Sequence, residues 1–139
     1  APSPIQGCLT FGQPEDNRYM STLPLQRLPL QELYFTQVAN GHVGGVDFFT
    51  GLAVVNPFDS DIAVTIRVFG SDGLLLGEVE RPLGPREKYV RLLQFIEGIG
   101  DLPDQSSGFI QVTATGPVLA FALFGDEPLN FLSAVPAQP

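Results

Sequence analysis

Apolar and polar side chains alternate along much of the chain with the period of two that is typical of β-strands. The segment 62–69 shows this most clearly, because isoleucine and valine fill every second position while Thr65 and Arg67 fall on the opposite face. A glycine-rich turn at 70–73 follows, and 74–80 then predicts the returning strand of a hairpin. The same reasoning predicts further strands, each bounded by Gly, Pro, Asn or Asp, at 5–11, 19–23, 33–39, 51–56, 88–93, 108–114 and 118–124.

Two segments depart from simple alternation. Residues 92–97, which Gly98 ends, have room for one short helical turn near Leu93. Residues 118–124 are apolar at every position, which predicts a core strand that is either buried on both faces or central in a sandwich. Together these elements predict an all-β fold, an immunoglobulin-like antiparallel β-sandwich with one short helical turn.

Composition supports this interpretation and excludes some classes of binding partner. The 139 residues fit one domain, and 15 glycines and 13 prolines interrupt the chain too often for long helices. A net charge of −8 with a single lysine argues against a nucleic-acid partner and against anionic membranes. The longest apolar run, 118–124, is far shorter than the roughly 20 residues of a membrane-spanning helix, so no membrane insertion is expected.

An internal repeat relates the two ends of the chain. Residues 117–125 align with 4–12, and residues 131–138 align with 19–26 after one extra residue at Arg18, with seven identities over the 22 residues from 117 to 138. The spacing of about 112 residues is close to the length of one immunoglobulin-like domain. We therefore interpret 1–26 as the last hairpin of a preceding repeat, packed on the main domain or on a partner, and 27–139 as the β-sandwich domain.

An alternative interpretation places both hairpins in one domain as pseudo-symmetric halves of its sheets. In either case the first hairpin has to pack against something, because two strands alone are only marginally stable in water. An open hairpin edge also allows strand exchange, so the oligomeric state is expected to be a monomer or a strand-swapped oligomer.

The stretch Phe48-Phe49-Thr50-Gly51-Leu52-Ala53-Val54-Val55-Asn56-Pro57 resembles a tandem repeat of large bacterial extracellular proteins. In that repeat an aromatic pair precedes a Thr-Gly-aliphatic-Ala-x-x-Asn-Pro strand, and the later segments of this chain follow the pattern in order over roughly residues 33 to 138. The resemblance implies immunoglobulin-like or fibronectin-like modules and an extracellular or cell-surface location. It implies no catalytic residues.

Candidate binding residues are few. Phe48 and Phe49 follow a glycine-rich loop and are candidates for an adhesive tip, although packing over one end of the sandwich is the plainer interpretation. Tyr89 is a candidate platform for a glycan, with a core or sheet-surface tyrosine as the plainer interpretation. The chain has no tryptophan to strengthen the glycan hypothesis.

Catalytic groups are equally scarce. The single histidine, His42, lies in what reads as a flexible glycine-rich loop. The single cysteine, Cys8, aligns with Phe121, which we take as an inward position, and so predicts a buried, inert thiol. We expect no enzyme activity.

Calcium is the one cofactor that the sequence leaves open, because it prefers carboxylate and carbonyl oxygens. The candidate ligands lie in two acidic turns, although solvated turn formers are the plainer interpretation. They are Asp59, Asp61, Asp101 and Asp104.

These observations favour a non-catalytic module of an exported bacterial protein that serves as a structural spacer or adhesion unit. The alternative is a carbohydrate-binding module. The expected partners are glycans or neighbouring repeats.

Overall fold

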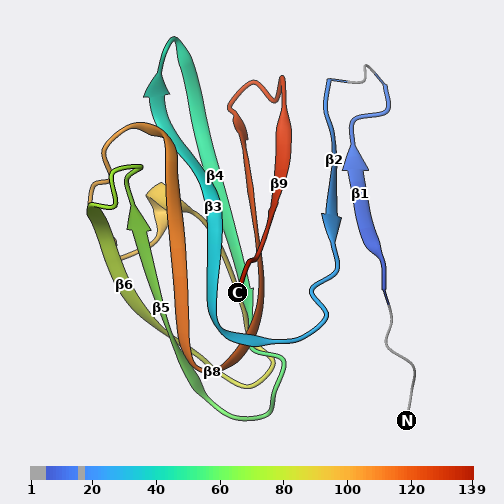
Figure 1. Ribbon diagram of the computed structural model, residues 1–139, viewed down its shortest axis with the longest axis vertical. Coiled ribbons are helices and arrows are strands. Elements are labelled where there is room, and N and C mark those ends of the chain that lie inside the picture. Colours follow the sequence, from blue (N-terminus) through green and yellow to red (C-terminus); the bar gives the residue numbers. More distant parts are fainter. Residues whose placement is uncertain (1–5, 16–17) are drawn as a thin grey trace.

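Two long strands, β3 (Leu30–Val43) and β8 (Gln105–Asp126), run through both layers of the structure (Figure 1). The computed structural model describes residues 6–15 and 18–139, and the fold is all-β, antiparallel and sandwich-like, as predicted. The other elements are β1 (Cys8–Gly12), β2 (Met20–Pro24), β4 (Val46–Val55), β5 (Ile62–Phe69), β6 (Leu75–Leu83), β7 (Lys88–Leu92), a 3₁₀ turn at Leu93–Phe95, and β9 (Leu132–Pro136).

The strand order shows how the layers share their long strands. One layer has the order β6-β5-β8-β3, and the other has the order β7-β4-β8-β9, in which the end of β3 also pairs with β4. The partner of β8 changes at a single step, since Val118 pairs with Leu30 of the first layer and Leu119 pairs with Val55 of the second. Gly116 and Pro117 precede this step. A Cβ atom on Gly116 would lie 2.8 Å from the side chain of Ile62, so the backbone here approaches its neighbour closely.

The predicted strands 108–114 and 118–124 are therefore two parts of one continuous strand. The predicted segment 5–11 corresponds to β1, although residue 5 lies outside the described residues. The hairpin of 62–69 and 74–80 is confirmed as β5 and β6, and the helical turn near Leu93 is confirmed as the 3₁₀ turn.

The core lies between the layers, and alternation predicts which side chains enter it. Ile62, Val64, Ile66 and Val68 of β5 are all buried. They pack with buried apolar side chains from every neighbouring element, which include Leu33, Phe35, Val38, Leu52, Val54, Leu83, Leu93, Ile110, Val112, Val118, Ala122 and Val135.

Of the two alternatives for 118–124, burial on both faces is wrong, whereas a central place in the sandwich is confirmed, because β8 lies between β4 and β9. Val118, Ala120 and Ala122 enter the core, but Phe121 on the opposite face is 37% exposed. The reason is that only one face of this part of β8 lies on the core. Its smaller side chains face the core, while Leu119 and Phe121 turn away from it.

Two buried polar side chains of the Thr-Gly-Leu-Ala-Val-Val-Asn-Pro stretch hold the backbone together. The Thr50 hydroxyl donates to the Ala39 carbonyl at 2.8 Å and accepts from the Ala39 amide at 3.0 Å. The Asn56 side-chain amide donates to the carbonyls of Ser60 at 2.7 Å and Gly84 at 2.9 Å, and its oxygen accepts from the Phe58 amide. Both side chains are fully buried, so these hydrogen bonds replace the water that each group has lost.

His42 lies in a strand, not in a flexible loop as predicted. β3 and β4 form a hairpin whose two-residue turn is Gly44-Gly45, and both glycines have positive φ, as a tight type I′ turn requires. His42 pairs across this hairpin with Asp47. Gly44 and Gly45 form this tight turn between two strands. The prediction of a flexible loop was wrong because glycines are common in both kinds of segment.

Asp126 ends β8 and organises the turn to β9. Its carboxylate accepts hydrogen bonds from the backbone amides of Asn130 at 2.7 Å and Phe131 at 3.2 Å, and from the Asn130 side chain at 2.9 Å. Burial favours the uncharged acid, but the hydrogen bonds from Phe131 and Asn130 outweigh it and lower the pKa of Asp126 below its ordinary value.

The variant Asp126→Asn is expected to be less stable than the parent chain at pH 7, with a difference that shrinks in acid. A carboxylate with a lowered folded-state pKa contributes stability above its ordinary pKa of roughly 4, and this contribution is lost as the pH falls through the folded-state pKa. Urea unfolding at pH 7 and pH 3 measures the difference. The neighbouring variant Glu127→Gln, at an exposed position, is the control. A difference of equal size at both pH values would contradict this role for the carboxylate.

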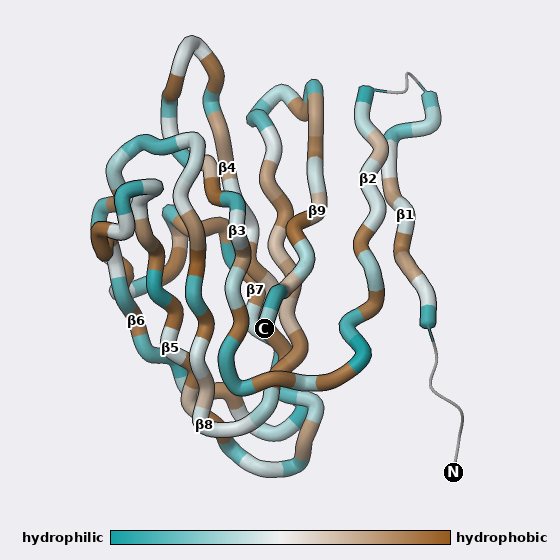
Figure 2. Tube along the Cα trace, in the orientation of Figure 1, coloured by the Kyte–Doolittle hydropathy of each residue, from teal (hydrophilic) through white to brown (hydrophobic). Residues whose placement is uncertain are grey.

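The N-terminal hairpin stands beside the sandwich. β1 and β2 form a two-stranded sheet, and β2 runs next to β9 (Figure 1). A hydrogen bond from the Ala134 amide to the Ser21 hydroxyl, at 2.7 Å, joins β9 to β2. Hydrophobic segments occur on β1 and β2 as well as on the strands of the sandwich (Figure 2). The hairpin thus packs on the main domain mainly through side chains.

Candidate functional site

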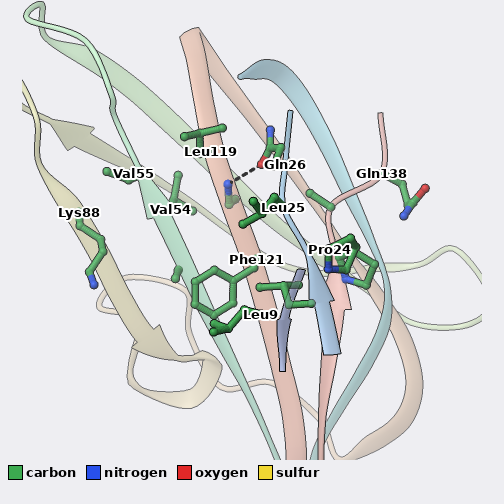
Figure 3. A pocket seen from close by; sticks show the side chains of 15 residues that line it. Leu9, Pro24, Leu25, Gln26, Val54, Val55, Lys88, Leu119, Phe121 and Gln138 are labelled. Carbon is green, nitrogen blue, oxygen red and sulfur yellow. Dashed lines mark hydrogen bonds between the residues drawn. The ribbon is translucent and has the colours of Figure 1, made fainter. Parts of the chain in front are cut away.

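An apolar pocket of about 400 Å³ separates the N-terminal hairpin from the outer face of the second layer (Figure 3). The hairpin contributes Leu9, Leu23 and Leu25, and the sheet contributes residues of β4, β7, β8 and β9. The remaining lining residues are Pro24, Gln26, Ala53, Val54, Val55, Lys88, Leu119, Ala120, Phe121, Pro136, Ala137 and Gln138.

The sheet side of the pocket follows from the alternation of β4 and β8. Ala53 pairs with Phe121, and Val55 pairs with Leu119, so these four side chains share the face that turns away from the core. In Figure 3 the ring of Phe121 lies close to Leu9 of the hairpin. The outer face of this layer is therefore apolar, and the hairpin covers only part of it.

Gln26 connects the hairpin to the sheet at the upper end of the pocket in Figure 3. Its side-chain oxygen accepts a hydrogen bond from the Ala120 amide at 2.9 Å, and its nitrogen donates to the Leu28 carbonyl at 2.8 Å. The β9 ladder ends at Pro136, which pairs with Phe121. Gln26 thus provides a hydrogen-bond acceptor for an amide of β8 that lies beyond the end of β9. The same hydrogen bond fixes the point at which the chain leaves the hairpin.

The two hairpins of the repeat have the same backbone arrangement. β1 pairs with β2 from Cys8↔Pro24 to Gly12↔Met20, and β8 pairs with β9 from Phe121↔Pro136 to Gly125↔Leu132. Every one of these five pairs joins positions that the sequence alignment makes equivalent.

Each hairpin has a glycine at the equivalent position, Gly12 or Gly125, and the structural reason for glycine is the same in both. A Cβ atom on Gly12 would lie 2.6 Å from the Tyr19 carbonyl oxygen, and a Cβ atom on Gly125 would lie 2.6 Å from the Phe131 carbonyl oxygen. Tyr19 and Phe131 are themselves equivalent positions. The repeat therefore describes the same hairpin twice.

The predicted aromatic binding residues pack within the domain. Phe48 is half-buried, with its ring 6.1 Å from that of Phe131 in an edge-on arrangement, and Phe49 lies over Gly125. Both contacts are with the closing hairpin, so the structure favours packing at the end of the sandwich over a projecting tip.

Tyr89 is 9% exposed and belongs to the core cluster. The guanidinium groups of Arg81 and Arg91 lie over its ring, 5.2 and 5.1 Å from the ring centre, a distance that suits cation–π contacts. The buried hydroxyl has no hydrogen-bond partner among the described residues. A ring that is so deeply buried is a poor platform for a sugar.

The calcium candidates lie in two separate places. Asp59 forms an ion pair with Arg86 at 2.9 Å, whose hydrogen bond and charge lower the pKa of Asp59, while Asp61 is exposed nearby. Asp101 lines a second pocket of about 320 Å³, and the Asp104 carboxylate lies against Gly41. No group of three His, Cys, Asp or Glu side chains within residues 6–15 and 18–139 is arranged to hold a metal ion.

Asn40 also lines the second pocket, and its buried side-chain oxygen has no hydrogen-bond partner among the described residues. The same holds for the buried side-chain nitrogen of its cross-strand neighbour Gln105.

The remaining reactive groups are exposed. His42 Nδ1 is 2.6 Å from Asp47 Oδ1, and hydrogen bonding with this carboxylate raises the pKa of His42. The prediction of a buried Cys8 is wrong, because its thiol is exposed. The alignment with Phe121 is correct in register, but Phe121 itself faces outward, since Ala120 and Ala122 occupy the inward positions.

Sequence reasoning missed the apolar pocket and the role of Gln26. A signal for the pocket was present in the repeat, because Leu9 and Leu23 align with Ala122 and Val135. These two residues are buried in the core, which marks the equivalent leucines as an apolar face.

Comparisons with known proteins bear on the fold. No family model and no curated protein matches the sequence. The structure is similar to the crystal structure of Thermotoga maritima 1070, with a TM-score of 0.59 and 16% identity over 79% of this chain and 91% of that one. It is also similar to the Anabaena sensory rhodopsin transducer, with a TM-score of 0.55 and 13% identity over 66% and 93%. At these identities the likeness concerns the fold alone.

The described part of the chain contains no helix with the length and apolarity needed to span a membrane.

Proposed function

We propose that this chain is a non-catalytic, immunoglobulin-like module of an exported bacterial protein, and that it serves as a structural spacer or adhesion unit at the cell surface. The observation that carries the proposal is the duplicated hairpin. One sandwich is accompanied by two closing hairpins, which agree in strand bounds, in register and in the position of a close-contact glycine. Such a duplication is expected when units of one kind follow one another along a chain.

The contacts of the candidate residues are consistent with a structural role. The phenylalanines at 48 and 49 pack on the closing hairpin, two arginines lie over the ring of Tyr89, and Asp59 pairs with Arg86. Each of these four side chains is engaged in a contact within the domain. The resemblance to tandem extracellular repeats points the same way.

A glycan and polysaccharide panel, screened with calcium and again with a chelator, tests the proposal. We expect no saturable binding and no change of melting temperature on adding calcium. Phe95, which is 65% exposed, is the most open aromatic side chain of the described residues, so Phe95→Ala is the matched variant. Saturable binding that this variant weakens would replace the spacer with a carbohydrate-binding module. A chelator-sensitive signal would direct attention to Asp59 and Asp101.

A further inference from the structure

The two equivalent hairpins differ in what lies beyond their first strand. The segment Phe121–Gly125 of β8 pairs with β9 on one edge and with β4 on the other, from Phe121↔Ala53 to Gly125↔Phe49. β1 is its sequence equivalent, and among the described residues it pairs with β2 alone. The edge of β1 that corresponds to the β4 side of β8 is therefore open.

The open edge lacks the usual protection. Edge strands in soluble proteins are blunted by charged side chains, by proline or by a bulge. β1 has the sequence Cys-Leu-Thr-Phe-Gly, with no charge and no proline, and its pairing with β2 is regular. Such an edge is suited to pairing with another strand.

The apolar face of the hairpin is also incomplete. Leu9 and Leu23 are equivalent to Ala122 and Val135, which are 0% and 5% exposed in the core of this domain. Leu9 is 57% exposed. In this chain Leu9 and Leu23 line the pocket against the outer face of the sheet. The apolar face of the hairpin, whose equivalent in β8 and β9 enters the core, therefore has no core to enter.

We propose that the open edge of β1 receives the strand equivalent to β4 from a preceding unit of the same kind, and that Leu9 and Leu23 enter the core of that unit. This proposal rests on the proposed function as a module in a series. The pairing register is fixed by the β4–β8 ladder, so Cys8 faces the residue equivalent to Ala53, and Gly12 faces the residue equivalent to Phe49.

A tandem chain tests the proposal directly. A second copy of residues 27–116 is fused to the N-terminal side of Pro4, so that its Gly116 is followed by a proline, as it is at Pro117 in the parent sequence. Residues 4–26 then occupy the position of a closing hairpin for the added copy. Cys8 is the only cysteine of the sequence, so one further cysteine defines a pair.

The variant Ala53→Cys in the added copy is expected to form a disulfide with Cys8 under mild oxidation. Facing residues of antiparallel strands have Cα atoms about 4.5–5.5 Å apart, within the range that a disulfide spans, whereas diagonal neighbours are roughly 7–8 Å apart. Val55→Cys, two residues along the same face of the same strand, is the matched control and is expected to remain reduced.

A second measurement compares Leu9→Ser in the parent chain and in the tandem chain. The parent chain should keep its melting temperature to within about 1 °C, because Leu9 is mostly exposed there. The tandem chain should lose about 5 °C or more in the transition of the added copy, as for a core leucine.

Three results would overturn the proposal. They are a tandem chain in which Ala53→Cys and Val55→Cys cross-link alike, one in which the added copy stays unfolded, and one in which Leu9→Ser has no larger effect than in the parent chain. A concentration-dependent dimer of the parent chain with protected β1 amides would assign the edge to a second copy instead. A positive glycan panel would remove the spacer role and leave this docking result untouched, so the two failures are distinguishable.

Discussion

Replacement of Asn56 by alanine is expected to lower the free energy of unfolding by about 3 kcal/mol, because a fully buried side chain that makes three hydrogen bonds is lost. The side chain is 0% exposed and bridges the turn after β4 to the turn after β6 through Ser60 and Gly84. The loss should therefore exceed that of an ordinary surface hydrogen bond.

Urea unfolding of Asn56→Ala against the parent chain measures this effect. Gln31→Ala is the control, because Gln31 also donates one side-chain hydrogen bond to a carbonyl, that of Thr115, but is exposed. Its free energy of unfolding should stay within about 0.5 kcal/mol of the parent value. Equal losses in the two variants would show that burial of Asn56 does not set its contribution.

Gly125→Ala is expected to lower the free energy of unfolding by about 2 kcal/mol, which is typical of overpacking in a well-packed position. The added methyl group would lie 2.6 Å from the Phe131 carbonyl oxygen, and this is backbone that cannot rotate away. The strand pair β8–β9 would have to separate at this point. Val135, a core residue of β9, would shift with it.

Gly12→Ala is the matched variant, because it creates the same 2.6 Å contact with the Tyr19 carbonyl oxygen in the equivalent hairpin. We expect it to change the unfolding of the sandwich by no more than about 0.5 kcal/mol, since β1 contributes no residue to the core cluster. Guanidinium unfolding of both variants makes the comparison. Similar losses would mean that the N-terminal hairpin is part of the cooperative core.

Alternation predicted the strands well, because it depends on which side chains face the core. In β5, every second residue is buried as expected. Alternation carries no information on pairing partners, however. The transfer of β8 from Leu30 to Val55 as its neighbour depends on contacts between segments far apart in the sequence. The continuous strand across Gly116 and Pro117 therefore could not be predicted.

The candidate site was harder to predict for the same reason. Arg81, which covers one face of Tyr89, lies on a different strand. The inward or outward direction of Phe121 depends on the layer around it, and the error there carried over to Cys8. The duplicated hairpin was accessible from sequence, because identical glycines and prolines recur at fixed spacing. The unpaired edge of β1 could be found only in the structure, where the equivalent edge of β8 pairs with β4.

The position of β8 also governs the order in which this chain can fold. β8 is central to both layers and begins only at Gln105, and its pairing with β3 joins residues as far apart as Leu30 and Val118. Before it is present, hairpins such as β5–β6 have no complete layer to join. Closure of such distant contacts is slow, typically milliseconds to seconds in all-β domains. The domain should thus form in one late, concerted step once residues 105–126 are available, and a growing chain would carry its apolar strands uncovered until then.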